Sequence, residues 1–388
     1  MSSKIVLNFF AIFLGTALAL LSGEVFLKIY YGGNRTFCVR EPRAFLEIEM
    51  PDGVFPGVSK QLQYSTNSQG MRGEDYPGEA FSYRILAMGG STTLCYFLDD
   101  AKTWPALVQK TLDKTTDGRA VWIGNIGKNA MTTRHHALQM ICFVPQYRCD
   151  AILLLVGIND LISRLSSPEN YNSAFINDDR LRRETFSVIP DRMIHPFYKR
   201  LGFWKLARQT KNYFSQHAKE TDFRNELQKL RDYRRNSRAI ATLPDLSRAL
   251  EEYARNLTEI IKLANQKNIR LILMTQPALW RNDMTPEEQA ALFFGFIGDP
   301  HVAADRAYYS PEVLAEGMQR YNQKLLELGR QYGVECIDLA AKLPQNLHVM
   351  YDDCHFTEYG AQLVAAMVVD YLKKQSPFAA QHDNLTIN

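Results

Sequence analysis

Three side chains of this sequence have the types and the spacing that nucleophilic acyl transfer requires. Ser91 follows a short apolar run, residues 85–88, and two glycines, so its hydroxyl would stand where a strand turns into a helix. His355 carries an imidazole, which titrates near neutral pH and can take the hydroxyl proton. Asp352 lies three residues earlier, a spacing that puts a carboxylate beside the ring, where it can fix the tautomer. Together they predict a serine nucleophile with its base and orienting acid.

Acyl transfer also needs hydrogen-bond donors for the oxyanion. Asn159 lies in Gly-Ile-Asn-Asp, which follows an unbroken apolar run typical of a strand. Its side-chain amide can donate a hydrogen bond to the oxyanion. A backbone N–H from the turn at residues 127–130 could add another donor. We therefore expect four short stretches, 89–92, 125–132, 157–160 and 352–355, to form one site.

The elements around these stretches follow an α/β pattern. Apolar runs typical of strands alternate with segments of helical spacing, which predicts a parallel sheet with right-handed crossovers. Open sheets of this kind bind ligands at the carboxyl ends of their strands, where the four stretches would lie. The expected strands are 83–88, 120–126, 151–156, 269–275 and 334–339, and the expected helices are 103–112, 132–144, 246–267, 286–296, 311–332 and 358–373.

The amino-terminal segment predicts a membrane anchor. Residues 5–31 are nearly all apolar up to Glu24 and end in two tyrosines, a length and composition that suit a bilayer span. A cleaved signal peptide is the alternative. The apolar region is long for one, and the sequence at its end is a poor cleavage site, so we favour the anchor. Lys4 favours a cytoplasmic amino terminus, whereas Lys28 and the arginines after it weaken that orientation. The catalytic domain is expected outside the cytoplasm, on a single-pass cell-membrane protein.

The rest of the chain divides by composition. A signal anchor at 1–31 and an irregular lead-in at 32–80 precede a domain at 81–374, and a polar tail follows at 375–388. An insertion at about 161–240 interrupts the domain with polar, proline-punctuated sequence. Its aromatic stretch, 195–204, could touch membrane or a partner, but we expect it to pack on the domain. Arg72, in the lead-in, is expected to be structural.

Composition excludes several function classes. The chain of 388 residues has a net charge of +3 and no basic run interleaved with aromatics, so no nucleic acid is expected as a partner. Six cysteines show no zinc-finger spacing, and no metal or other cofactor is expected. Cys142 and Cys149 are close enough in sequence to pair in an oxidising compartment, although free buried thiols remain an alternative.

Each stretch also has a plainer interpretation. Gly-Gly-Ser-Thr could be a turn and a helix cap, Asn159-Asp160 a turn, and Asp352-Asp353 a cap for the last helix. A metal site built from His135, His136, Asp352 and His355 is a weaker alternative, because adjacent histidines on a helix point about 100° apart. The common placement of all four stretches favours catalysis.

The four stretches, in this order, resemble the blocks of the SGNH hydrolases, also called the GDSL esterase/lipase superfamily. The resemblance covers roughly residues 83–372 and rests mainly on Gly-x-Asn-Asp and Asp-x-x-His. It implies a flavodoxin-like three-layer α/β/α sandwich and a triad of Ser91, His355 and Asp352. It also implies an oxyanion hole from the backbone N–H groups of Ser91 and Ala130 and the Asn159 side chain.

The sequence departs from the family pattern at two places. The first block reads Gly-Gly-Ser rather than Gly-Asp-Ser. Ala130 occupies the second-block position that usually holds the oxyanion glycine. Alanine still offers its N–H if its φ is negative, and Gly127 is the alternative donor if the turn demands a positive φ.

The residues and the resemblance together predict a membrane-anchored serine esterase that hydrolyses acyl esters, with O-acetyl groups of a glycan as the expected substrate. Two alternatives remain open. The same triad could pass an acyl group to an envelope polysaccharide, or the chain could be a noncatalytic glycan-assembly protein.

Overall fold

The computed structural model describes residues 3–31, 36–50, 55–78, 81–167, 179–194, 197–216, 220–303 and 305–379. Its contacts divide the chain into two compact units. Unit 1 consists of Met1–Phe37 and Val188–Glu226, and unit 2 of Cys38–Ser187 and Leu227–Asn388. Unit 2 contains all four stretches that the sequence singles out.

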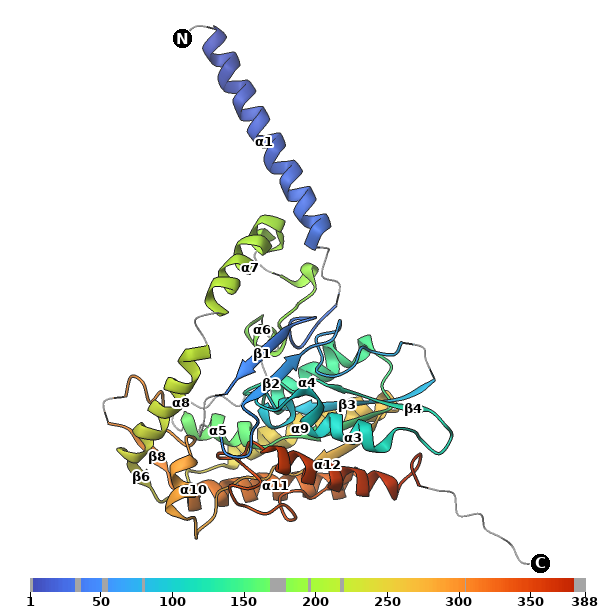
Figure 1. Cartoon of the computed structure of the whole chain (residues 1–388), viewed down its shortest axis with the longest axis vertical. Helices are drawn as coiled ribbons and strands as arrows, with labels where there is room; N and C mark the ends of the chain where they lie inside the picture. The colour runs from blue at the N-terminus through green and yellow to red at the C-terminus, as the bar shows by residue number, and fades with distance from the viewer. Residues whose placement is uncertain are drawn as a thin grey trace, which may run out of the picture. The chain divides into compact units, whose positions relative to one another are not determined.

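The strands of the described residues belong to unit 2, and several of them are labelled in Figure 1. They are β1 Phe45–Glu49, β2 Gln61–Ser65, β3 Ser82–Gly89, β4 Ala120–Asn125, β5 Ala151–Leu155, β6 Arg238–Ile240, β7 Arg270–Met274, β8 Ala307–Tyr309 and β9 Glu335–Ile337. The α-helices are α1 Ser3–Tyr31, α2 Ser91–Leu94, α3 Trp104–Leu112, α4 Thr133–Cys142, α5 Ile158–Ser166, α6 Asp179–Thr185, α7 Gly202–Gln216, α8 Glu220–Arg235, α9 Ser247–Gln266, α10 Pro286–Ala291, α11 Pro311–Tyr332 and α12 Glu358–Lys373. Short 3₁₀ helices are η1 Asp100–Lys102, η2 Val144–Gln146, η3 Asp191–Met193 and η4 Phe197–Arg200.

The centre of unit 2 is a five-stranded sheet in the order β4-β3-β5-β7-β9. All of its pairings are parallel. Every residue of β3 and β5 is buried, which is why both strands read as continuous runs rather than alternating patterns. The order of the strands is that of a flavodoxin-like sheet, whose ligand crevice lies at the carboxyl end of its first strand, where the direction of winding reverses. That strand is β3, and Ser91 follows it directly.

Helices cover both faces of the sheet. The chain crosses from β3 to β4 in one direction and then back to β5, so right-handed crossovers place α3 and α4 on opposite faces. α12 packs on α3, whereas α4 and α11 pack on α9 (Figure 1). These two groups and the sheet form the three-layer α/β/α sandwich that the sequence predicts.

Some predicted boundaries are wrong, each for a local reason. The helix expected at 286–296 ends at Ala291, because Leu292 is extended and the next two N–H groups donate to the Asp353 carboxylate. The lead-in is not wholly irregular, since β1 and β2 pair antiparallel. The tail begins as ordered chain, with Thr116 donating to Pro377, while residues 380–388 lie outside the described residues.

The structure also answers two questions that the sequence left open, on the cysteines and on the aromatic stretch of the insertion. All six cysteines are free thiols, so Cys142 and Cys149 are not paired. Residues 195 and 196 are not among the described residues. The rest of the aromatic stretch, from Phe197, belongs with α1 in unit 1.

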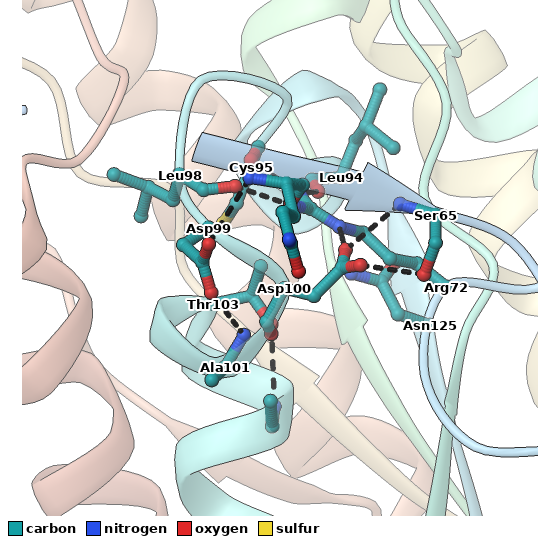
Figure 2. A network of polar contacts seen from close by, with 12 residues as sticks. Ser65, Arg72, Leu94, Cys95, Leu98, Asp99, Asp100, Ala101, Thr103 and Asn125 are labelled. Atoms are coloured by element: carbon teal, nitrogen blue, oxygen red, sulfur yellow. Dashed lines mark hydrogen bonds and ion pairs between the residues drawn. The ribbon is translucent and has the colours of Figure 1, made fainter. Parts of the chain in front are cut away.

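Arg72 is buried in unit 2 and ties the lead-in to the segment that carries Ser91. Its Nη1 donates to the carbonyls of Leu94 (2.9 Å) and Cys95 (2.5 Å), and its Nη2 donates to that of Leu98. Its Nε pairs with Asp100 at 2.6 Å (Figure 2). The carbonyls at the end of α2 lack helical partners, and a guanidinium satisfies several of them at once. The structural role expected for Arg72 agrees with these contacts.

Replacing Arg72 with methionine should lower the free energy of unfolding by about 3–5 kcal/mol, because the change leaves buried carbonyls and the Asp100 carboxylate without their partner. Arg72→Lys should lose less, since an ammonium still carries the charge but cannot reach as many acceptors. Denaturant unfolding measures both changes.

Arg320→Met is the matched control, because Arg320 and Glu316 form an exposed pair on α11. Its expected cost is below about 0.5 kcal/mol. Equal losses for Arg72→Met and Arg320→Met would contradict the role given to Arg72.

Candidate active site

The structure brings Ser91, His355 and Asp352 into one hydrogen-bonded chain. The Ser91 Oγ lies 2.7 Å from Nε2 of His355. The other ring nitrogen, Nδ1, lies 2.8 Å from both carboxylate oxygens of Asp352. This geometry allows a proton to pass from the hydroxyl to Nε2 while the carboxylate holds the N–H of Nδ1.

Asp352 is placed by the tight turn that it caps. Its Oδ1 accepts the backbone N–H groups of Cys354 (3.0 Å) and His355 (2.9 Å), and the residue is 1% exposed. The alternative that Asp352 and Asp353 cap the last helix is wrong, because Thr357 caps α12 through the N–H of Gly360. Both aspartates are thereby left for other partners.

The two glycines before Ser91 are required by close approach. An ideal Cβ on Gly90 would lie 2.4 Å from Nδ2 of Asn159, and one on Gly89 would lie 2.5 Å from the Leu155 carbonyl oxygen. Gly90 has φ −81°, so close approach and not a positive φ is the reason for glycine at this position. The aspartate of the usual first block would therefore collide with Asn159 here. α2 has four residues, too short for a substantial helix dipole.

The second-block turn corrects the expectation for the oxyanion donors. Ala130 has φ +59°, so the condition of a negative φ is not met. The alternative donor is also excluded, because the Gly127 N–H already donates to Oδ1 of Asn125 at 2.9 Å. The left-handed conformation does not remove the N–H of Ala130. Among the described residues, that N–H has no hydrogen-bond acceptor.

Asn159 is fixed against the same turn. Its Nδ2 donates to the Met131 carbonyl at 2.9 Å, which leaves the second amide hydrogen for another acceptor. The next residue, Asp160, accepts the N–H of Thr133 at 3.0 Å and its hydroxyl at 2.6 Å. Burial raises the pKa of Asp160 to about 7. Two adjacent residues of the third stretch thus hold Met131 of the second stretch and Thr133 at the start of α4.

Two residues that the sequence analysis did not assign to the site support its loops. Nδ2 of Asn125 donates to the Thr93 carbonyl at 2.7 Å. Arg40 is 7% exposed and donates to the carbonyls of Asn125 (2.6 Å) and Gly127. Asn125 stood in the second block, but Arg40 had no signal, because a lone arginine in a lead-in has no periodicity or motif.

Asp353 was also missed, although it stands between two assigned residues. It is fully buried, and its carboxylate accepts the indole N–H of Trp280 (2.8 Å) and the N–H of Phe293 (2.8 Å). These bonds position the segment whose Phe294 ring lies 6.1 Å from the His355 ring. Burial raises the pKa of Asp353.

The electrostatics of the site centre on His355. Burial acts to lower its pKa, but the adjacent Asp352 carboxylate outweighs burial and raises that pKa well above the usual range. The stacked ring of Tyr351, 5.7 Å away, covers one side of the imidazole. A raised pKa makes the imidazole a stronger base once it is neutral.

The residues of the alternative metal site do not come together in the structure. His135 caps its own helix through Thr132, and Nδ1 of His136 lies 2.8 Å from Gln139. Burial lowers the pKa of both histidines to about 4. In the part of the chain that the structure describes, the one group with metal-type geometry is Asp352, Cys354 and His355, without either of these histidines.

Several solved structures of low identity align with much of the chain. A lipase/acylhydrolase from Enterococcus faecalis is 16% identical (TM-score 0.40; 77% of this chain and all of that chain covered). A G-D-S-L family lipolytic protein from Veillonella parvula is 12% identical (TM-score 0.40; 76% and 100% covered). An acetylxylan esterase from Geobacillus stearothermophilus is 12% identical (TM-score 0.40; 75% and 94% covered). No curated protein sequence matches the chain.

The sequence model of one family matches residues 87–363, which is well over half of the chain and includes all four stretches. This chain belongs to the GDSL-like lipase/acylhydrolase family and is an ester hydrolase.

Proposed function

We propose that this chain is a membrane-anchored serine esterase in which Ser91 is the nucleophile, His355 the general base and Asp352 its orienting acid. The observation that carries the proposal is the continuous hydrogen-bonded chain from Ser91 Oγ through the imidazole to the Asp352 carboxylate. A serine hydroxyl is a weak nucleophile until a base in this position takes its proton.

The reaction has two halves. Ser91 Oγ bonds to the ester carbonyl carbon as its proton moves to Nε2 of His355, and the carbonyl oxygen becomes an oxyanion. The C–O bond to the alcohol then breaks, and His355 returns the proton to the leaving alcohol. Water, deprotonated by the same nitrogen, attacks the acyl-enzyme, and the acid leaves as Ser91 recovers its proton.

Three donors would hold the oxyanion in this proposal: the backbone N–H groups of Ser91 and Ala130, and Nδ2 of Asn159. Donors that are already oriented when charge develops supply much of the rate enhancement of such enzymes. The bond from Asn159 to the Met131 carbonyl supplies that orientation.

The anchor and the substrate belong to the same proposal. Ile5–Tyr30 is long and apolar enough to cross a membrane, although a signal sequence would pass the same test. As an uncleaved anchor it would hold the domain on the outer side, beside envelope glycans, and an O-acetyl group on such a glycan is the proposed ester. A transferase would instead pass the acyl group to a sugar hydroxyl, and product analysis with an added glycan separates the two.

Ser91→Ala should reduce hydrolysis of p-nitrophenyl acetate by at least about 10³-fold, because it removes the hydroxyl that is paired with His355. Labelling by a fluorophosphonate probe should disappear with it. Ser247→Ala, at an exposed serine on α9, should change neither. Full activity in Ser91→Ala would refute the nucleophile, and an unlabelled, inactive parent protein would favour the noncatalytic alternative.

The acid limb of the pH profile should report His355. Only the neutral imidazole can act as base, so kcat/KM should rise with pH through a pKa raised above its usual 6.5. Asp352→Asn removes the charge that raises this pKa and leaves the burial that lowers it, so the limb should move to lower pH. kcat should fall by about 10³–10⁴-fold. A limb that stays in place would show that another group titrates.

Ala130→Gly tests the left-handed turn. Glycine adopts φ +59° without the Cβ strain of alanine, so the variant should be more stable by up to about 1 kcal/mol and should keep its kcat/KM. Ala130→Val should lose stability and about tenfold or more in kcat/KM, because a β-branched residue resists this conformation and shifts the N–H. Equal kinetics in both variants would remove Ala130 from the oxyanion hole.

A further inference from the structure

Unit 1 carries a cluster of exposed apolar side chains on η4 and the start of α7. Phe197 is 72% exposed, and the other members of this aromatic cluster are exposed by 41–43%: Tyr198, Phe203, Trp204 and Leu206. The rings of Tyr198 and Trp204 contact each other edge-on at 5.2 Å. Five large apolar side chains exposed within ten residues mark a surface that meets something other than water.

The same segment is strongly basic. Residues 188–216 contain a single acidic side chain, Asp191, which pairs with Lys205 at 2.9 Å. The other basic side chains are Arg192, Lys199, Arg200, Arg208 and Lys211. Aromatic and basic side chains together are typical of segments that lie on anionic membrane surfaces.

The amino terminus of α7 is attached to α1. The carboxylate of Glu24 accepts the N–H groups of Gly202 (2.8 Å) and Phe203 (3.1 Å). Two glycines allow the close approach: a Cβ on Gly23 would lie 2.8 Å from the Phe203 ring, and one on Gly202 would lie 2.5 Å from Cβ of Leu27. The aromatic cluster is therefore held at a defined level along α1.

That level corresponds to a membrane surface. The hydrocarbon core of a bilayer needs about 20 helical residues. Counted from Ile5, where the apolar span begins, about 20 residues reach Glu24. Glu24 and Lys28 are the first charged residues after Lys4. The contacts of α7 with Gly23, Glu24 and Leu27 thus fall where the span would leave the hydrocarbon.

We propose that η4 and the first half of α7 form a second membrane contact, which lies on the bilayer surface beside the end of α1. The aromatic cluster would enter the interface, and the basic side chains would bind anionic lipid headgroups. The inference rests on the proposed anchoring by α1. It goes beyond that anchoring because it assigns a lipid-binding surface to a segment that begins 166 residues after the end of α1.

Tryptophan fluorescence offers a selective test. Of the four tryptophans, Trp104, Trp122 and Trp280 are 4% exposed or less, whereas Trp204 is 43% exposed. The full chain would be placed in nanodiscs of phosphatidylcholine and phosphatidylglycerol, with plain or brominated acyl chains. Brominated chains should quench the emission by up to about a quarter, the share of one tryptophan in four.

Trp204→Phe is the matched control, because it keeps an aromatic ring and should abolish the quenching while ester hydrolysis is unchanged. Replacing Lys199, Arg208 and Lys211 with glutamine should reduce the quenching in the anionic discs. Discs without phosphatidylglycerol should give the parent protein a similar reduction, since the charged headgroups are then missing.

The outcomes separate this inference from the proposals on which it depends. Unquenched emission from a chain that stays in the discs would overturn the lipid contact and leave the anchor intact, and a protein partner would then be the remaining occupant. A chain that carbonate washes from membranes would overturn the anchor and this inference together. Loss of ester hydrolysis with unchanged quenching would bear on the proposed active site and leave the lipid contact in place.

Discussion

One buried guanidinium connects the parts of unit 2 on which the chemistry depends. Arg72 comes from the lead-in, yet its acceptors are the carbonyls that follow Ser91, and its own backbone pairs with Asn125 at the end of β4. Leaving such a charge unpaired in the interior would cost several kcal/mol, so its acceptors must stay in place. The lead-in therefore supports the proposed active site, and Arg40 likewise binds the carbonyls of Asn125 and Gly127 in the second-block turn.

The proposed oxyanion hole depends on the backbone of the first stretch lying closer to its neighbours than a Cβ atom would permit. Gly89 and Gly90 let the first stretch lie directly against Leu155 and Asn159. Ala130 reaches its position only by adopting a left-handed conformation. Asn159 and Asp160 then hold this turn through Met131 and Thr133, so the strain is offset by bonds from the neighbouring strand end.

The fold was predictable because buried parallel strands leave continuous apolar runs, and the strands β3 and β5 were found within a residue or two. Ser91, His355 and Asp352 could be named as candidates because Asp352 and His355 are three residues apart and Ser91 follows a strand-like run and two glycines. The sign of φ at Ala130 could not be predicted from the sequence, because it depends on the hydrogen bonds that hold the folded turn. Nor could the partners of Asp353, because Trp280 and Phe293 are distant in sequence and only the fold brings them together.

The separation of Ser91 and His355 along the chain has a consequence for biosynthesis. The two residues are 264 positions apart, and the serine is synthesised first. At a translation rate of about 5–20 residues per second, roughly 13–50 s pass between the synthesis of the proposed nucleophile and that of its base. The growing polypeptide therefore lacks the proposed base of Ser91 until His355 has been added. The apolar segment Ile5–Tyr30 would by then have left the ribosome, so delivery to a membrane could precede activity.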